Sequence, residues 1–517
     1  MTDTVSQRSS TIHEETVHEK AVMPSDQKDP YLIDSFEEGD PANPKVCGFV
    51  DFWYFIHLMV QFENWSRLRR WYLTIFVGML VLNATFASAA PSGIAVQLLE
   101  EYHMSQEVGT LAISLFVAGY CVGPILWGPL SEHYGRWPIF FYPFVVYTLF
   151  QVGCALAKNA ATILVLRFLG GTFAAAPLTN SGGVISDIWD SGTRGKALAL
   201  FTLAPFAGPT IGPTVAGFIS TSGTDFRWVF WVLAIFAGVC CLLIVFTLPE
   251  TYVPVLLARK AAKKRKDTGD PLFHAPMEKI VLTAWERAEN ILARPFKPML
   301  LAMTLYMSFV YGCIYLLFEA YPIVFTEGHH LSAGISGLMF LPLLLGGTTS
   351  VTISIVVFNP RYEREAARLA PPASPPEFRL EMALIAAPLY VVAFFWFGWT
   401  SFPSISLWAP LMSGYVLGFA INWIFVDAQF KVNPAPNNLL FLDTYLSIAA
   451  SALAGNTVVR SVFGAVFPLF ATQMYNALGP RWASSLLGFV ALIMVPIPIV
   501  LMRFGPTIRA KSKFVPV

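Results

Sequence analysis

The chain has 517 residues, of which 55% are hydrophobic and 13% are charged, and its mean hydropathy is +0.57. A water-soluble protein of this size cannot cover so much apolar surface, so lipid must be the solvent for much of it. The net charge of +1 gives no basic footprint for nucleic acid. The sequence also lacks metal-ligand spacing, a Ser/His/Asp constellation and a phosphate-binding glycine loop. These features predict an all-α integral membrane protein that is not an enzyme and uses no cofactor or metal.

Residues 1–70 precede the apolar bulk of the chain and are expected to form a cytosolic N-terminal tail. Its first 45 residues are polar, bury too little apolar area to fold alone, and lack the apolar core of a signal peptide. Residues 46–63 form an unusual apolar and aromatic insertion. A helix that lies in the membrane interface would explain this insertion.

Apolar stretches of about 20 residues, the length that crosses a bilayer, recur along the rest of the chain. The first six are 71–91, 108–128, 138–157, 160–182, 197–219 and 228–248. The second six are 299–319, 334–358, 381–402, 405–426, 444–470 and 482–502. The pattern predicts two pseudo-symmetric six-helix halves, 71–248 and 299–503. A cytosolic middle loop, 249–298, joins them, and a cytosolic tail, 504–517, follows.

The basic residues indicate on which side of the membrane each loop lies. If the N-terminus is cytosolic, 29 of the 34 Lys and Arg residues are cytosolic, and only Lys158, Arg227 and Arg481 lie outside. An excess of Lys and Arg marks the cytosolic loops of membrane proteins. Both termini and the middle loop are therefore expected in the cytosol. A thirteenth span within 46–63 would invert this count.

A short turn between the second and third spans contains glycines and opposite charges. It reads Gly128-Pro129-Leu130-Ser131-Glu132-His133-Tyr134-Gly135-Arg136. Glycines let two helices approach closely, and charges at helix ends can join neighbouring helices. We expect Glu132 and Arg136 to form a cytosolic latch that holds one face of a transporter shut. The alternative is a charged loop that serves only to set the topology.

The fourth span contains a cation, Arg167, within LVLRFLGG. A charge near the middle of a bilayer costs at least about 2.5 kcal/mol, so it needs a partner, water or a substrate. Arg167 is therefore a functional candidate. The alternative is an arginine that only hydrogen-bonds carbonyl groups at a helix end.

The fifth span combines small residues with two prolines. Gly208, Gly212 and Gly217 lie at or near the small-x-x-x-small spacing that lets a neighbouring helix pack closely. Pro209 and Pro213 remove backbone donors and bend the helix. We expect a kinked, tightly packed gate, with ordinary helix packing as the alternative.

These three motifs resemble those of the major facilitator superfamily of transporters. The turn is similar to the signature Gly-x-Leu-Ala-Asp-Arg-x-Gly-Arg-Arg, with Glu132 in place of the acidic residue and His133 in place of the first basic one. The resemblance implies a role in proton coupling for Arg167. It also relates the paired Gly-Pro steps of the fifth span to the antiporter motif, which occurs in exporters and is rare in uptake carriers.

Further stretches resemble the twelve-span drug:proton antiporters of fungi, which export antifungals, polyamines and toxic metabolites. They are Pro177-Leu178-Thr179-Asn180-Ser181-Gly182-Gly183, Pro249-Glu250-Thr251-Tyr252, Phe318-Glu319-Ala320-Tyr321-Pro322 and the run ASALAGNTVVRSVFGAVFPLF. The resemblance covers nearly all of residues 64–505. The last run contains Arg460, a candidate for a structural or coupling role in the eleventh span.

Glu319 is an acidic residue at the predicted outer end of the seventh span. It would bind a proton or a cationic substrate if its side chain faced a central cavity, and it is a second candidate for proton coupling. The alternative is a solvated carboxylate at a helix end.

A second unusual stretch, about 427–441, separates the tenth and eleventh spans, which the resembling proteins connect tightly. Both insertions begin at Lys-Val, at Lys45-Val46 and Lys431-Val432, where the codons AAG-GT would form a splice donor. We hypothesise that one or both insertions are read-through introns. A transcript that retains both stretches would end this idea.

These expectations describe a monomeric secondary transporter in the lipid bilayer, with a small molecule and protons as its partners. It would export drugs, toxins, polyamines or secondary metabolites by alternating access of two halves around a central cavity. The plasma membrane is the expected location, and the vacuolar membrane is the alternative. The other functions considered are a proton-coupled importer of the same fold and a transport-inactive nutrient sensor.

Overall fold

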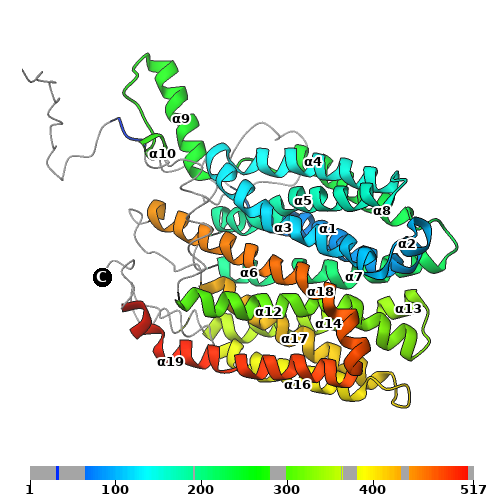
Figure 1. Cartoon of the computed structure of the whole chain (residues 1–517). Helices are drawn as coiled ribbons and strands as arrows, with labels where there is room; N and C mark the ends of the chain where they lie inside the picture. The colour runs from blue at the N-terminus through cyan, green and yellow to red at the C-terminus, as the bar shows by residue number, and fades with distance from the viewer. Residues whose placement is uncertain are drawn as a thin grey trace, which may run out of the picture.

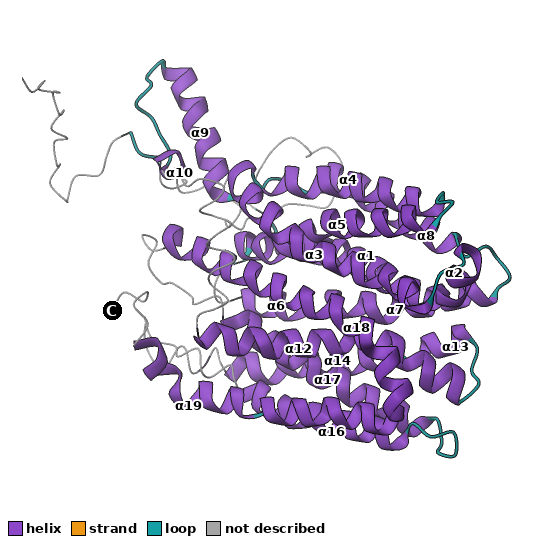
Figure 2. Cartoon of the chain, in the orientation of Figure 1, coloured by secondary structure: helices purple, strands orange, loops and turns teal. Residues whose placement is uncertain are grey.

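The computed structural model describes residues 31–33, 65–189, 193–279, 298–361, 364, 381–431 and 442–510. Within these ranges the chain is helical, and the one β-type contact is an isolated bridge between Leu32 and His274. Figure 1 shows long helices that lie side by side, and Figure 2 shows loops mainly at the two ends of the bundle. A helix pairs its own backbone N–H and C=O groups, for which hydrocarbon offers no hydrogen-bond partners. The insertion 46–63 lies outside the described residues.

The first half contains six rods of helix. They are α1 (Arg67–Ala89) continued by η2 (Ala90–Ile94) and α2 (Ala95–Tyr102), α3 (Gln106–Tyr134), α4 (Arg136–Ala155), α5 (Ala160–Ile188), α6 (Arg194–Phe201) continued by α7 (Ala204–Thr221), and α8 (Trp228–Thr247). The predicted spans coincide with these rods, except that 138–157 and 228–248 run two residues and one residue past the ends of α4 and α8. Two rods extend about one and a half turns beyond their predicted ends, because residues such as Ser131 in α3 and Ile188 in α5 are buried against other helices.

The second half begins after the amphipathic α9 (Val253–Thr268) and the short α10 (Pro276–Lys279). Its helices are α12 (Pro298–Tyr321) continued by the π-helical η4 (Pro322–Gly328), α13 (Ala333–Leu338), α14 (Leu341–Ile353) continued by η5 (Ser354–Phe358), α16 (Glu381–Thr400), α17 (Trp408–Lys431), α18 (Leu442–Met494) and α19 (Pro496–Ala510). The start of the second unusual stretch, 427–431, is the end of α17. Residues 432–441 lie outside the described ones.

The helix α18 contains a reversal of the chain at Gly479. This residue has φ 72° and ψ 159°, a backbone conformation that favours glycine, and Pro480 follows it. Eleven described stretches are apolar and long enough to cross a membrane, and the last, Gly455–Phe504, has 50 residues. Such a helix would extend about 75 Å, more than twice the roughly 30 Å of hydrocarbon. Divided at Gly479, this stretch crosses twice, which gives the predicted twelve spans.

The two ends of the bundle differ, and we name them by the helices that they carry (Figure 1). The "α9 end" carries α9 and the turn from α3 into α4. The "α2 end" carries α2, η4 and the turn at Gly479. The two halves meet along two seams, where α3 packs against α18 and where α7 packs against α13 and α14.

Candidate functional site

Arg136 forms the centre of a charged network at the α9 end. Its Nε donates to Oδ2 of Asp187 at 3.1 Å, and its Nη1 donates to Oγ of Ser131 at 2.9 Å. The guanidinium also lies over the ring of Tyr252, 4.6 Å from its centroid. Arg136 is 8% exposed, so this ion pair is largely shielded from water. The network therefore joins α3, α4, α5 and the segment after α8, all within the first half.

The carboxylate of Glu250 covers the first turn of α4. It accepts four backbone hydrogen bonds, from the N–H groups of Arg136 (2.7 Å), Trp137 (3.3 Å), Thr251 (3.1 Å) and Tyr252 (3.0 Å). A negative charge at a helix N-terminus satisfies otherwise unpaired N–H groups and opposes the helix dipole. Gly135 has φ 99°, and a Cβ at this position would overlap the Glu250 carboxylate. The turn therefore requires glycine at position 135.

The residues predicted to form the latch contact more partners than the sequence suggested. Glu132 lies near Arg136, and Arg136 forms an ion pair with Asp187. Gly128, Pro129 and Leu130 lie within α3, which continues to Tyr134, and all three are half-buried. Asp187 was missed because it lies just beyond the predicted end of the fourth span, and Glu250 was noted only as part of a resembling stretch.

The Arg136–Asp187 pair predicts a measurable coupling energy. Breaking a buried ion pair by removing one partner costs about 3 kcal/mol or more, because the other charge remains buried. We expect Arg136→Gln and Asp187→Asn each to lower the melting temperature of the purified transporter. The double variant should lose less than the sum of the two, because no lone charge is left behind. Additive losses would show that the pair does not act as a unit.

Arg167 is fully buried and donates to three backbone carbonyl oxygens. Its Nε reaches Ala112 of α3 at 2.7 Å, and its two Nη atoms reach Ala87 at 2.7 Å and Ser88 at 3.2 Å. Ala87 and Ser88 lie in the last turn of α1, where carbonyls lack partners within the helix. Pro91 also has no N–H to give to Ala87, four residues earlier. Arg167 therefore replaces a missing backbone donor.

The surroundings of Arg167 match the helix-end alternative in this conformation. The guanidinium lies 4.1 Å from the ring centroid of Phe116, and it forms no ion pair among the described residues. A role in proton coupling stays a prediction for this residue.

A chain of polar groups leads from Arg167 into the second half. The Ser88 hydroxyl lies 2.8 Å from the Tyr315 hydroxyl, which lies 3.3 Å from that of Tyr311. The guanidinium of Arg460 lies over the Tyr311 ring, 4.8 Å from its centroid. These contacts bring two of the predicted arginines to opposite ends of one polar path that connects α1 of the first half with α12 and α18 of the second half.

Glu319 lies where α12 meets the α3–α18 seam. The Thr472 hydroxyl of α18 donates to its Oε2 at 3.2 Å, and Thr110 of α3 lies beside the carboxyl group. The helix continues past Glu319 through η4 to Gly328, so the carboxyl group is about two turns from the helix end. A solvated helix end therefore does not describe its position. The carboxyl group contacts both halves of the bundle.

The motif of the fifth span packs against two different partners. A Cβ at Gly208 would overlap the backbone of Thr85 and Phe86 in α1, so this glycine permits close packing within the first half. Nearer the α2 end, a Cβ at Gly217 would overlap the backbone of Ala333 in α13. Gly212 packs tightly against the end of α1, and the Pro213 carbonyl lies against Gly337 of α13. The motif thus helps to form the seam between the halves.

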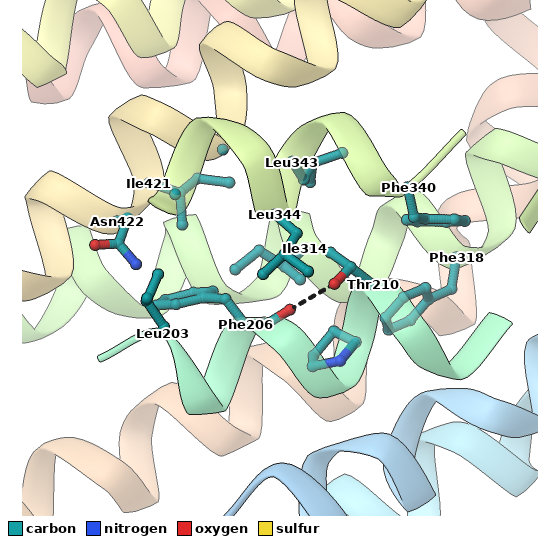
Figure 3. A pocket seen from close by; sticks show the side chains of 13 residues that line it. Leu203, Phe206, Thr210, Ile314, Phe318, Phe340, Leu343, Leu344, Ile421 and Asn422 are labelled. Carbon is teal, nitrogen blue, oxygen red and sulfur yellow. Dashed lines mark hydrogen bonds between the residues drawn. The ribbon is translucent and has the colours of Figure 1, made fainter. Parts of the chain in front are cut away.

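An apolar pocket lies between the halves, bordered by α7, α12, α14 and α17 (Figure 3). Its walls are Leu203, Phe206, Pro209, Thr210, Ile314, Phe318, Phe340, Leu343, Leu344, Gly347, Gly418, Ile421 and Asn422. The Thr210 hydroxyl is used within its own helix, since it donates to the Phe206 carbonyl at 3.1 Å. Asn422 is 1% exposed, and neither atom of its amide has a hydrogen-bond partner in the described structure.

An unpaired buried amide is costly, so Asn422 is the polar group in this pocket that most needs a ligand. Mostly apolar walls with a few unpaired polar groups are typical of small-molecule sites. Asn422 was not among the predicted site residues, although an asparagine inside a long apolar span is a visible signal in the sequence. Pro209, by contrast, was predicted as part of the gate and proves to line the pocket.

Comparison with known proteins agrees with this architecture. A family model described as Major Facilitator Superfamily matches residues 74–438. The chain belongs to this superfamily. The superfamily predicted from the motifs is therefore confirmed, as is the fold of twelve transmembrane helices in two halves.

Its relatives include named fungal transporters. The major facilitator superfamily multidrug transporter mdrA of Aspergillus fumigatus is 39% identical over 494 residues, which cover 94% of this chain and 76% of the relative. The efflux pump FUBT of Fusarium oxysporum is 38% identical over 454 residues, which cover 87% of this chain and 74% of the relative. The predicted similarity to fungal exporters is therefore confirmed.

A solved structure, that of the proton:xylose symporter XylE, superposes with a TM-score of 0.59 at 16% sequence identity. The alignment covers 85% of this chain and 96% of XylE. At this identity the likeness supports the fold. With the family match, it makes this chain a multi-pass membrane protein of a transporter superfamily.

Proposed function

We propose that this chain is a secondary transporter that exports small molecules from the cytosol in exchange for protons. The observation that carries the proposal is the apolar pocket between the two halves, with the unpaired amide of Asn422 in its wall. A site between two halves that rock against each other is exposed to each side of the membrane in turn. The names of the relatives, a multidrug transporter and an efflux pump, support the direction of transport.

The α9 end is proposed to face the cytosol. This end carries the basic run of α9, which contains Arg259, Lys260, Lys263, Lys264, Arg265 and Lys266. An excess of such residues favours the cytosolic side. Both termini would then also be cytosolic, and the plasma membrane remains the proposed location. A vesicle assay with sided proteolysis of α9 would test this orientation.

The network around Arg136 is proposed to keep the first half rigid while the halves move. Its described partners, Asp187 and Ser131, belong to the same half, so the network need not break during rocking. This differs from a latch that joins the two halves. The Gly-Pro motif of α7 is proposed as the moving gate, because it contacts α13 across the seam and also lines the pocket through Pro209.

Glu319 is proposed as the group that binds and releases the proton. A guanidinium stays charged at all relevant pH values, so Arg167 can influence the coupling only through its position and charge. The Glu319 carboxyl group can change its charge, and it lies between α3, α12 and α18. Protonation there would change the contact between the halves at the α2 end.

The test uses purified protein in sealed liposomes with an imposed pH gradient and a library of apolar compounds. The wild type should accumulate at least one compound against its gradient, in the direction opposite to proton movement. Glu319→Gln should lose this pH-driven accumulation by about tenfold or more while retaining downhill exchange, because the amide cannot titrate.

Glu327→Gln is the matched control, because Glu327 follows on the same rod but is exposed. This variant should behave as the wild type does. Accumulation in the direction of proton movement would favour an importer, and the absence of any flux across the whole library would favour a sensor. Unchanged pH-driven accumulation by Glu319→Gln would exclude Glu319 as the proton carrier.

A further inference from the structure

Arg460 differs from Arg136 and Arg167 in that no described carboxylate or carbonyl accepts a hydrogen bond from its Nε. Arg136 has a carboxylate and Arg167 has three carbonyl oxygens. Arg460 is 9% exposed, its Nε has no hydrogen-bond partner in the described structure, and no described carboxylate forms an ion pair with it. A buried guanidinium in this situation has given up its hydration without gaining a counter-charge.

Aromatic rings are what Arg460 contacts instead. The guanidinium carbon lies 4.8 Å from the ring centroid of Tyr311 on α12 and 5.6 Å from that of Phe425 on α17. Cation–π contacts recover part of the lost hydration energy but supply no acceptor for the N–H donors of the guanidinium fork. These donors match the two oxygen atoms of a carboxylate.

One aromatic pair separates Arg460 from the pocket between the halves. The ring of Phe425 lies 4.9 Å from the ring of Phe206, centroid to centroid, and Phe206 is itself a wall of the pocket. Phe425 also follows Asn422 on α17 by three residues, about one helical turn, so the two side chains share a face of the helix. Arg460 and Asn422 therefore each have polar atoms without a partner in the described structure, Nε in Arg460 and the amide in Asn422, and Phe425 lies near both.

We infer that the substrates of this transporter are apolar organic acids, whose carboxylate pairs with Arg460 while the apolar body occupies the pocket beside Asn422. This inference rests on the proposed transport function. In the described conformation Phe425 and Phe206 lie between the two positions, so substrate entry requires one of these rings to turn aside. Neutral compounds would use the pocket alone, and cations would be disfavoured by the guanidinium charge.

The test compares three probes with the same ring system, 2-naphthoate, 2-naphthamide and 2-naphthylmethylammonium. Binding is measured as thermal stabilisation of the purified full-length protein, and flux is measured separately in liposomes. The wild type should bind 2-naphthoate about tenfold or more tightly than the amide, and the cation least, because a charge-assisted hydrogen bond distinguishes the acid.

Arg460→Gln should remove the preference for 2-naphthoate while leaving the affinity for 2-naphthamide within about twofold. Arg460→Lys should retain part of the preference, since it keeps the charge but loses the fork. Arg481→Gln is the matched control, because Arg481 also lies over an aromatic ring, that of Trp399 at 3.5 Å, but at the α2 end. The Arg481→Gln variant should show the same preference among the three probes as the wild type.

Equal binding of the acid and the amide by the wild type would overturn the inference, as would tighter binding of the cation. If Arg460→Gln is not stable enough to purify, the wild-type preference and the Arg460→Lys variant still decide the question. The proposed function fails separately, through the absence of pH-driven flux for every compound of the library. Flux of neutral or cationic compounds without binding of acids would therefore refute this inference alone.

Discussion

Replacing Arg167 by alanine should strongly reduce transport and weaken the bundle, even though no ligand needs to touch this residue. The change removes the guanidinium from the carbonyls of Ala87, Ser88 and Ala112, and Ala87 has no N–H four residues on to replace it, because that residue is Pro91. Unpaired buried acceptors cost about 1–3 kcal/mol each in soluble proteins, and hydrogen bonds between transmembrane helices average about 0.6 kcal/mol. With three bonds lost, we expect pH-driven export to fall about 100-fold, which corresponds to roughly 2.7 kcal/mol.

Two further variants separate the role of the charge from the role of the hydrogen bonds. Arg167→Lys keeps the charge, but an ammonium group cannot span three carbonyls as a planar guanidinium does. If the carbonyls matter most, the lysine variant should lose nearly as much transport as the alanine variant. Pro91→Ala returns an N–H group near the Ala87 carbonyl and should recover part of the thermal stability of Arg167→Ala. Transport by Arg167→Ala at the wild-type rate would remove the residue from the mechanism.

Adding a single methyl group at Gly208 should be nearly as damaging. The new Cβ would overlap backbone atoms of Thr85 and Phe86, which cannot rotate away as a side chain can. α7 would have to move off α1, and the walls that it gives to the pocket would move with it. We expect Gly208→Ala to reduce transport by about tenfold or more, in line with the 1–3 kcal/mol typical of overpacking.

Two helical glycines in open surroundings serve as controls for the Gly208→Ala prediction. Gly182 in α5 and Gly238 in α8 have no atom within 4 Å of a built Cβ, so alanine should be tolerated there. Gly212→Ala should have an intermediate effect, because its nearest contacts are 3.1–3.2 Å away. The yield of monodisperse protein in detergent measures the effect on packing and stability. The rate of flux in liposomes measures the effect on transport. Equal behaviour of Gly208→Ala and Gly238→Ala would contradict the close-packing interpretation.

The sequence was sufficient to predict the fold because the constraint from lipid is strong. Twenty apolar residues form a helix in hydrocarbon almost regardless of their order, so the number and approximate limits of the spans follow from hydropathy. The reversal at Gly479 falls between the predicted spans 444–470 and 482–502, where Pro480 follows the glycine. Helix ends were less accurate, because polar residues such as Ser131 remain helical when neighbouring helices bury them.

The arrangement of the site was harder to predict because its partners are distant in sequence. Arg136 and Asp187 are brought together only by the packing of α4 against α5, and no local pattern specifies that contact. The cation of the fourth span was recognised, but its partners are backbone carbonyls, which every residue has. Asn422 acquires its importance from what it does not contact. Such a lack of partners is visible only once the neighbouring helices are in place.

The seam between α7 and α13 has a further consequence for how the molecule opens. Backbone approaches backbone there through Gly217 and Gly337, and the Thr214 hydroxyl donates to the Gly337 carbonyl at 2.8 Å. Among the described residues no ion pair crosses this seam. Separating it therefore moves no charge away from a counter-charge, and the opening rate at this end should depend weakly on ionic strength. Membrane tension and lipid packing, which act on the shape of the bundle, should govern it instead.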